Sequence, residues 1–413
     1  MREMKDSGVA WIGEIPKEWE ISLINTLYTV RNTKVSDVDY QPLSVTMKGI
    51  VPQLSTAAKT NAHDDRKLVK KGDFAINSRS DRRGSCGISD YDGSVSLINT
   101  VLSPRNEMNP IYYSWLFHSS EFADEFYRWG HGIVDDLWTT RWQEMRNISI
   151  PVPPLSIQHQ IATYLDQKCT QIDALIINQQ KQIERLKAYK QSLITETVTK
   201  DLNPDVPMKD SGVEWIGEIP EDFSVQNIRS LFTIKKDIIG HEPDTVLSIT
   251  RSGIKIKDIS ENNGQMADSY ANYQIVNIGD FAMNHMDLLT GGIGISQYNG
   301  VTSPDYRVFN LKDNKMNPRY FLYIFETYYR NKIFYAFGQG AANLGRWRLP
   351  AKNFYSIYIP VAPIEEQQAI VSYLDKKCTQ IDSLIAIKQR KIEKLQQYKK
   401  SVIYEYVTGK KEI

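Results

Sequence analysis

The chain has 413 residues, of which 41% are hydrophobic and 24% charged, the balance of a globular protein with two or three domains. Three cysteines are too few for a disulfide-stapled scaffold, and no apolar run approaches the roughly 18–20 residues that span a bilayer. A net charge of +1, from 50 basic and 49 acidic residues, argues against a polycation that coats DNA through phosphates alone. The opening residues lack a signal-peptide core, so we expect a cytoplasmic protein that does not enter a membrane.

An internal repeat organises the sequence. Residues 4–16, MKDSGVAWIGEIP, return at 208–220 with one difference in thirteen. Residues 164–173, YLDQKCTQID, return at 373–382, again with one difference. One unit of about 205 residues is therefore written twice, with a shared opening, a divergent middle and a shared end.

The two middles, roughly 17–150 and 221–359, carry short apolar runs broken by Gly, Asn, Asp and Pro, which indicate strands and turns. Each middle also holds an aromatic stretch after an Asn-Pro pair, at 111–127 and 319–337. Because Asn caps helices and Pro fits the first helical position, these stretches are predicted to be helices. Both middles are therefore expected to be mixed α/β domains.

The shared ends predict two long helices. Residues 156–200 contain no Gly or Pro, and their apolar residues follow steps of 7, 4, 7, 3 and 7, a heptad seam. A helix of this length measures ~65 Å and buries its stripe best against its repeat. The chain's path then predicts an antiparallel, pseudo-twofold coiled coil with a globular domain at each end. The seam positions are Leu165, Ile172, Ile176, Ile183, Leu186 and Leu193, with Leu374, Ile381, Ile385, Ile392, Leu395 and Val402 in the second helix.

The predicted fold is thus mixed α/β, in four consecutive parts: a globular domain at 1–150, a central helical region at 151–203, a second domain at 204–359 and a distal helical region at 360–413. Residues 1–150 carry 18 basic and 20 acidic groups, and 201–359 carry 16 and 18. Each globular domain is slightly acidic, so any contact with DNA requires a local cluster of basic residues.

Three groups of residues are candidates for DNA contact. Arginine bonds guanine or phosphate in a bidentate manner, and glycine pairs allow a close backbone approach to DNA. Each group also has a purely structural alternative. The first group, described next, could be a solvated loop paired with Asp81, the second a turn leading into a packed strand, and the third a solvated strand face. The first group is Arg79, Arg82 and Arg83; the second is Trp138, Thr140 and Arg141 after Gly130-His131-Gly132, with Gln339, Asn343, Arg346 and Arg348 at the second copy; the third, one alternating strand face, is Arg251, Lys255 and Lys257.

The sequence gives little indication of catalysis, nucleotide binding or metal binding. Asn109-Pro110-Ile111-Tyr112 is similar to an adenine-orienting motif of amino-methyltransferases, but a helix start explains both copies better. No phosphate-binding loop of the form G-x-x-x-x-G-K-[ST] is present. The scattered cysteines and the His-Asp pairs do not make a metal site. We therefore expect no catalytic residue, no metal and no cofactor on this chain.

The doubled arrangement resembles one family, the specificity subunit (HsdS) of type I restriction–modification enzymes. The resemblance covers essentially the whole chain. Two departures are Phe223 in place of Trp19 and His159 in place of a usual Gln. The similar segments are DSGVAWIGEIPKEW at 6–19, IPVPPLSIQHQIATYLD at 150–166, IPVAPIEEQQAIVSYLD at 359–375, QIERLKAYKQSLITETVTK at 182–200 and KIEKLQQYKKSVIYEYVTG at 391–409.

The resemblance implies a non-catalytic DNA-binding subunit. Each globular domain would be a target recognition domain that reads one half of a bipartite, asymmetric sequence in double-stranded DNA. The helices would set the spacer and dock two methyltransferase subunits, which bind S-adenosylmethionine, and motor-nuclease subunits would complete the complex. An enzyme or a purely structural spacer are the alternatives; a gel shift with and without methyltransferase subunits separates the spacer from the DNA reader.

Overall fold

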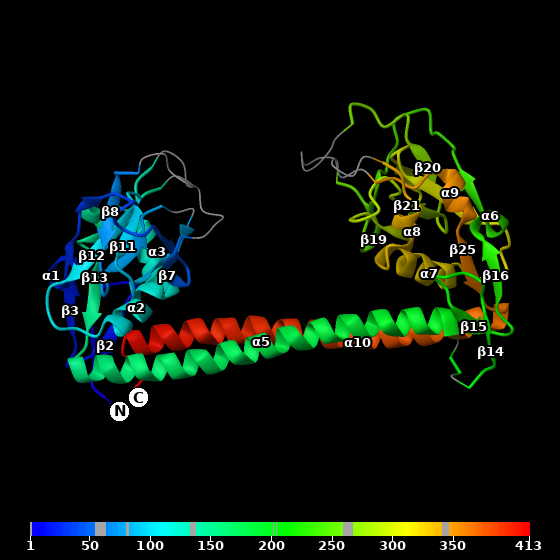
Figure 1. The fold of residues 1–413 in the computed structure, drawn as a ribbon. Coiled ribbons are helices and arrows are strands. Elements are labelled where there is room, and N and C mark those ends of the chain that lie inside the picture. The colour runs from blue at the N-terminus through cyan, green and yellow to red at the C-terminus, as the bar shows by residue number, and fades with distance from the viewer. Residues whose placement is uncertain are drawn as a thin grey trace. The chain divides into compact units, whose positions relative to one another are not determined.

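The computed structural model describes residues 2–53, 63–79, 82–132, 138–200, 202–203, 205–258, 267–340 and 347–413. The chain folds into two compact units (Figure 1). The first consists of Met1–Lys181 with Lys388–Ile413, and the second of Gln182–Ile387. Each unit therefore holds one globular domain together with part of each long helix.

The globular domain of the first unit is built from thirteen strands and four short helices in its described part. They are β1 (Met4–Asp6), β2 (Glu14–Pro16), β3 (Glu20–Leu23), α1 (Ile24–Leu27), β4 (Tyr28–Val30), β5 (Lys34–Val35), β6 (Leu43–Thr46), β7 (Gly49–Pro52), β8 (Arg66–Val69), β9 (Phe74–Asn77), β10 (Cys86–Ile88), β11 (Gly93–Ser96), β12 (Asn99–Pro104), α2 (Pro110–His118), α3 (Ser120–Arg128), α4 (Trp142–Met145) and β13 (Ser149–Val152).

The second unit repeats this plan. Its elements are β14 (Met208–Asp210), β15 (Glu218–Pro220), β16 (Ser224–Asn227), α6 (Ile228–Leu231), β17 (Phe232–Lys235), β18 (Leu247–Thr250), β19 (Gly253–Ile256), β20 (Gln274–Val276), β21 (Phe281–Met283), β22 (Ile293–Ile295), β23 (Gly300–Thr302), β24 (Arg307–Leu311), α7 (Pro318–Arg330), α8 (Ile333–Ala336), α9 (Ala351–Ser356) and β25 (Tyr358–Val361). The long helices are α5 (Leu155–Lys200) and α10 (Ile364–Val407).

The central sheets of the two domains have the same strand order. In the first unit the order is β10-β9-β12-β4, and in the second β22-β21-β24-β17, all antiparallel. The registers match as well, because Thr100 lies opposite Ile76 and Arg307 lies opposite Met283. The predicted repeat is thus a repeat of structure down to individual positions.

The Asn-Pro helix starts are confirmed. The Asn109 side chain accepts hydrogen bonds from the amides of Ile111 and Tyr112, and Asn317 accepts one from Arg319. Each aromatic stretch is nevertheless divided in two. Ser119 caps a new helix, α3, in the first domain, and Lys332, at φ 58°, precedes α8 in the second. A new cap and a left-handed residue both end the preceding helix.

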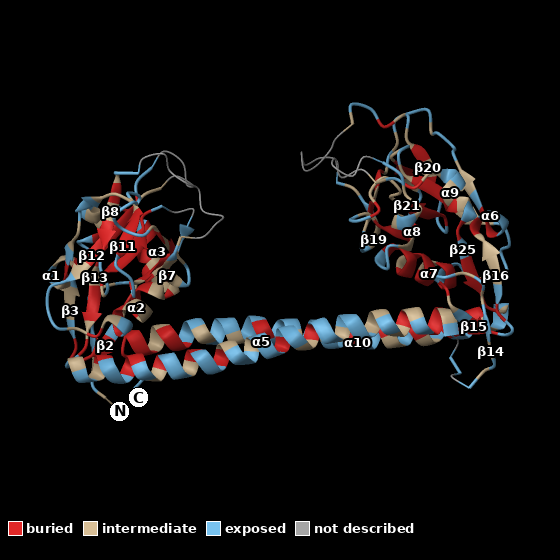
Figure 2. Ribbon diagram, in the orientation of Figure 1, coloured by how far each residue is buried: buried red, intermediate tan, exposed pale blue. Residues whose placement is uncertain are grey.

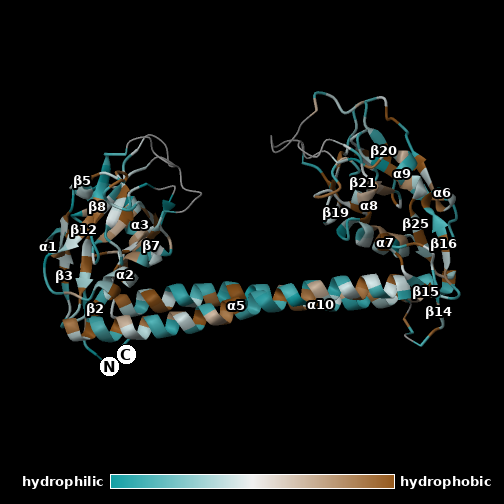
Figure 3. Cartoon of the chain, in the orientation of Figure 1, coloured by the Kyte–Doolittle hydropathy of each residue, from teal (hydrophilic) through white to brown (hydrophobic). Residues whose placement is uncertain are grey.

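Within each unit, the two long helices bury or half-bury the predicted seam positions. Seven of the twelve predicted positions are buried and the other five are intermediate in exposure. In the first unit Lys399 pairs with Asp173 at 2.7 Å, and in the second Lys190 pairs with Asp382 at 2.7 Å. Within the first unit Tyr164 contacts Tyr406 and Asp173 pairs with Lys399, so residue numbers rise along α5 as they fall along α10 and the pairing is antiparallel. Figure 2 shows buried residues recurring along both helices, and Figure 3 shows apolar residues alternating with polar ones.

Each domain core includes the helix ends that belong to its unit. In the first unit Tyr112 is fully buried, and its hydroxyl donates to the Val407 carbonyl at 2.8 Å. In the second, Tyr320 at the equivalent position donates to Val198 at 3.4 Å. Trp19 and Phe223 are both 1% exposed, so the substitution between repeats is a change within a core.

Two predicted domain boundaries need correction. The boundary at 150 falls inside β13, which pairs along its length with β3, and the boundary at 359 falls inside β25, which pairs with β16. Because these strands are hydrogen-bonded into their domains, each domain extends to the end of its last strand.

In the described part of the chain, no helix combines the length and the apolar character required to cross a bilayer.

Candidate nucleic-acid interface

The arginine loop of the first domain follows β9. Arg79 is exposed, and its backbone forms an isolated antiparallel bridge with Thr139. Arg83 pairs with Asp124 of α3 and lies over the Tyr127 ring, 5.6 Å from its centroid. Arg82 is exposed, with no side-chain partner among the described residues. The loop therefore offers Arg79 and Arg82 to solvent, whereas Arg83 is engaged within the domain.

The Gly-His-Gly and Gly-Gln-Gly segments occupy equivalent places. His131 and Thr139 exchange backbone hydrogen bonds of 3.2 and 3.1 Å, and Gln339 and Arg348 exchange bonds of 2.8 and 3.0 Å. Each pair closes a loop at its base. Gly130 is suited to this place because a Cβ atom there would lie 3.1 Å from the Thr140 hydroxyl. The pairing of these segments in the sequence is thus reproduced in three dimensions.

Thr140 is a correction to the predicted contact set. Its side chain is 0% exposed, and its hydroxyl donates to the Phe126 carbonyl at 2.8 Å. Its amide donates to Ser78 at 2.9 Å. Because no atom of the side chain reaches the surface, Thr140 holds the loop base against β9 and does not contact DNA.

A cavity of about 480 Å³ brings the first domain's candidates together. Arg79 and Arg141 both line it, so residues 62 positions apart in sequence meet at one surface. The half-buried Trp138 precedes Thr139, another lining residue. The remaining polar walls come from residues that the sequence did not single out: Asn32, Lys67, Ser78, Thr100 and Gln143.

The second domain has a corresponding cavity of about 230 Å³. Thr100 corresponds to Arg307 by sheet register. Thr140 and Leu349 donate to Ser78 and His285 respectively, which makes those two positions equivalent. The shared loop base makes Thr139 equivalent to Arg348. Nine lining positions match in this way: Val30/Ile234, Asn32/Lys236, Lys67/Gln274, Ser78/His285, Leu97/Pro304, Thr100/Arg307, Thr139/Arg348, Arg141/Pro350 and Trp142/Ala351.

The two cavities therefore share a scaffold and differ in their polar lining. Such a difference is what two readers of unlike sequences require, since base contacts depend on which donors and acceptors are presented. Of the second-copy candidates, Arg348 lies at this cavity and Gln339 lies exposed at its loop base. Asn343 and Arg346 lie outside the described residues.

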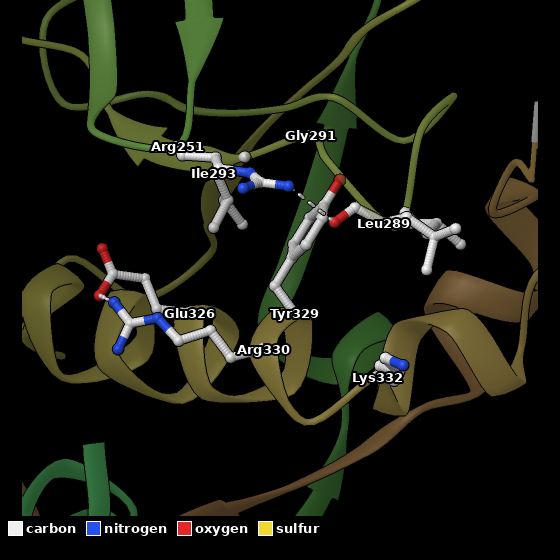
Figure 4. A pocket seen from close by; sticks show the side chains of 10 residues that line it. Arg251, Leu289, Gly291, Ile293, Glu326, Tyr329, Arg330 and Lys332 are labelled. Atoms are coloured by element: carbon white, nitrogen blue, oxygen red, sulfur yellow. Dashed lines mark hydrogen bonds and ion pairs between the residues drawn. The ribbon is translucent and has the colours of Figure 1, made fainter. Parts of the chain in front are cut away.

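Arg251 lines a different cavity of the second domain, about 310 Å³ in volume. It lies in the turn between β18 and β19, not on a strand, so the predicted alternation with Lys255 and Lys257 is wrong for this residue. Its guanidinium donates to the carbonyls of Thr290 at 3.0 Å and Leu289 at 3.3 Å. Figure 4 shows the Arg251 guanidinium pointing toward the turn at Leu289 and Thr290, with Glu326 and Arg330 of α7 on the other side of the cavity. Arg251 thus braces a loop, while Lys255 is exposed on β19.

Residues with other reactive chemistry are occupied structurally. All three cysteines are free and buried, and burial raises the pKa of the Cys169 thiol to about 11. Among the described residues, no group of three His, Cys, Asp or Glu side chains is placed to hold a metal ion. The buried, protonated thiols are poor nucleophiles.

Known proteins are similar to this chain in sequence. The sequence profile of one family, described as the type I restriction modification DNA specificity domain, matches residues 16–186 and 220–397. Two proteins of Methanocaldococcus jannaschii are each 25% identical: the MjaX type I restriction enzyme specificity subunit, over 97% of this chain and 95% of its own, and the MjaVIII specificity subunit, over 96% and 93%.

Solved structures agree on the fold. A chain from a structure reported as the basis of complex assembly and conformational transition of the type I R-M system aligns with a TM-score of 0.70 at 12% identity, covering 95% of this chain and 98% of that one. The HsdS subunit of Thermoanaerobacter tengcongensis aligns with a TM-score of 0.50 at 14% identity, over 96% and 98%.

Proposed function

Because the chain belongs to the type I restriction modification DNA specificity family, we propose that each of its two domains reads one half of a bipartite, asymmetric target in double-stranded DNA. The observation that carries this proposal is the pair of equivalent cavities with different polar linings. A shared scaffold supplies the same approach to DNA, and the different side chains supply different sequence preferences.

We propose that the chain performs no reaction itself and that S-adenosylmethionine binds to a partner methyltransferase. The Asn-Pro-x-Tyr segments support this reading, because Asn109 and Asn317 use their side-chain oxygens to cap helices. Tyr112 and Tyr320 are fully buried, so neither copy presents its motif to a nucleobase. The three buried free thiols suit a reducing compartment such as the cytoplasm.

We propose that the long helices dock two methyltransferase subunits, one on each unit. In the first unit Leu175, Ile177 and Tyr398 are 46%, 50% and 46% exposed. In the second unit Leu384, at the position equivalent to Leu175, is 47% exposed and Tyr189 is 55% exposed. Exposed apolar residues that recur at repeat-related positions are a suitable surface for two copies of one partner. Motor-nuclease subunits would then join this assembly.

A co-purification and gel-shift experiment tests this proposal. The full chain, co-expressed with methyltransferase subunits, is expected to retain them and to shift duplex DNA, whereas the chain alone binds DNA weakly because its domains are slightly acidic. The double change Leu175→Glu and Leu384→Glu is expected to release the partner. Gln180→Glu with Gln389→Glu, also exposed and repeat-related, is the matched control.

Nanomolar sequence-specific binding by the isolated chain, or full retention of the partner by the leucine variant, would contradict the proposal.

We also propose that helix length sets the spacer between the half-sites. Adding one heptad to both helices at matching levels preserves the apolar seam and lengthens each helix by ~10 Å, about three base pairs of duplex. The methylated sites of that variant are expected to keep both half-sites and gain a longer spacer, although the added groove rotation of roughly a third of a turn lowers activity. Unchanged spacing would show that the helices do not set it.

A further inference from the structure

Four equivalent positions at the two cavities change from a neutral to a basic residue type. In the first domain they are neutral: Asn32, Ser78, Thr100 and Thr139. In the second domain all four carry basic side chains: Lys236, His285, Arg307 and Arg348. Two other pairs, Lys67/Gln274 and Arg141/Pro350, change from basic to neutral. The second cavity is therefore distinguished by the position of its basic groups, with the guanidinium of Arg307 buried at its lining.

In the first domain, two of the four neutral side chains satisfy each other's hydrogen-bonding groups. Ser78 and Thr100 are 4% and 5% exposed, and their hydroxyls lie 3.0 Å apart in a hydrogen bond. A buried polar pair of this kind needs no ligand. The first cavity is therefore complete as it stands at these two positions.

The basic set is not satisfied. Arg307 is 5% exposed, and its Nη2 donates to the Leu349 carbonyl at 2.7 Å, but its Nη1 and the Nδ1 of His285 are buried without a partner in the described part of the chain. The Arg307 guanidinium also stacks on the Phe354 ring, 4.7 Å from its centroid, which fixes its place. A buried cation that lacks an anionic partner destabilises the fold unless a ligand compensates it.

Nearby charges do not neutralise the cluster. Lys235, which also lines the cavity, is paired with Asp280 at 2.6 Å. Lys236 and Arg348 are exposed, and no ion pair of either is found within the described ranges. Burial lowers the pKa of Arg307 to about 10 and that of His285 to about 3, with Arg348 lowering both and no carboxylate raising either.

We propose, on the basis of the proposed DNA-reading function, that the second-domain cavity is a phosphate-binding site that receives a backbone phosphate of DNA, with Arg348 and Lys236 at its exposed rim and Arg307 below them. A phosphate is the ligand that matches, because several cations converge and its oxygens accept from guanidinium groups. A recessed guanidinium cannot extend into a groove to reach a base edge, whereas phosphates protrude from the duplex. The first domain has Thr100 in place of the buried Arg307, so the two cavities differ at this position.

The first experiment measures binding of DNA by the complex with methyltransferase subunits. The duplex contains the sequence at which the complex methylates adenine. Arg348→Thr and Arg307→Thr, which install the first-domain residue, are each expected to weaken binding roughly tenfold. The loss should be even across sequences and should flatten the slope of log affinity against log salt by about 0.9 per lost contact. Lys315→Thr, an exposed charge loss in the same domain away from the cavity, is the control.

Arg307→Thr changes a core contact, so that variant could fail to fold. In that case Arg348→Thr and Lys236→Asn, both at the exposed rim, still test the proposal. Unchanged affinity and slope in both rim variants would overturn the proposal. A changed base preference with an unchanged slope would also overturn it, since that outcome means base reading.

The second arm uses inorganic phosphate and the chain alone, at constant ionic strength. Phosphate is expected to raise the Tm of the wild type, by ligand linkage, but not that of the Arg348→Thr and Lys236→Asn double variant. If DNA binding by the complex fails while this phosphate effect is present, the oxyanion site stands and the DNA-reading function fails. If the wild type shows no phosphate effect and the DNA slope is unchanged, the site itself is wrong.

Discussion

The two cavities are built on the same backbone frame and are lined by different side chains. Ser78 and Thr100 bond to each other in the first domain, whereas His285 and Arg307 at the same positions retain unpartnered nitrogens in the second. The strand order, the register and the loop base are unchanged between them. A recognition fold can therefore keep its hydrogen-bonded frame while the residues facing the ligand diverge, because frame and lining are different positions.

The largest expected effect comes from breaking the frame one unit at a time. Leu165 and Leu374 are equivalent and both 0% exposed. Truncation of either to alanine is expected to cost about 2–5 kcal/mol, since each leaves a cavity. Hydrogen exchange should show the loss mainly within residues 2–181 and 388–413 for Leu165→Ala and within 182–387 for Leu374→Ala. Equal loss of protection throughout the chain would contradict the division into two units.

The arginine loop sharpens the comparison at the level of DNA. Arg82 is exposed and unpartnered in the described structure, and Arg83 is paired with Asp124. We expect Arg82→Ala to affect only the half-site read by the first domain, and to relax one position by about 1–3 kcal/mol if it reads a guanine. Even weakening on all sequences would indicate a phosphate contact instead. Arg83→Ala is the matched comparison, expected to have the smaller effect; the reverse order in mapped methylation sites would contradict this assignment.

Acid should destabilise the second unit through His285. Burial, then Arg307, Arg348 and Lys236, lower the folded-state pKa of His285 to about 3, below the ordinary value of about 6.5. The unfolded chain therefore binds a proton that the folded chain does not, and stability is lost as pH falls from about 6.5 towards 3. Between pH 6.5 and 5 the loss is roughly 2 kcal/mol. His285→Ser, the first-domain residue, should remove this component from denaturant unfolding curves; an unaltered pH dependence would argue against it.

The smallest effect concerns the helix caps. Asn109→Ala and Asn317→Ala each remove a side-chain cap, at an expected cost of about 1 kcal/mol each. His159→Gln is a useful control, because Asn109 contacts His159 at 2.7 Å where Asn317 contacts Gln368 at 2.8 Å. Denaturant midpoints should fall for both alanine variants and stay close to wild type for His159→Gln. A large loss in the control would mean that the histidine has a role its counterpart lacks.

Local patterns made much of the fold predictable. Asn109 and Asn317 predict helix starts because capping depends on residues that are close in sequence. The heptad seam is predicted from residue spacing alone. The break at Ser119 was missed because the aromatic pattern continues through it, although its hydroxyl caps α3.

The site was less predictable because it assembles distant residues. Arg307 begins a strand and reads as an ordinary strand residue, and only sheet register places it opposite Met283 and level with Thr100. Thr140 was wrongly assigned to the surface because sequence does not reveal its bond to Phe126. Comparing the repeats position by position for neutral-to-basic changes was the available signal, since the GDFA segments already align Ser78 with His285.

Mapping the methylated adenines in DNA exposed to the complex tests whether the two similar domains read different half-sites. We expect one bipartite target with two different halves and a fixed spacer. Changes at Arg82 should alter the preference at one half only, and changes at Arg348 should weaken binding to the whole target. A single continuous target, or two identical halves, would contradict this expectation.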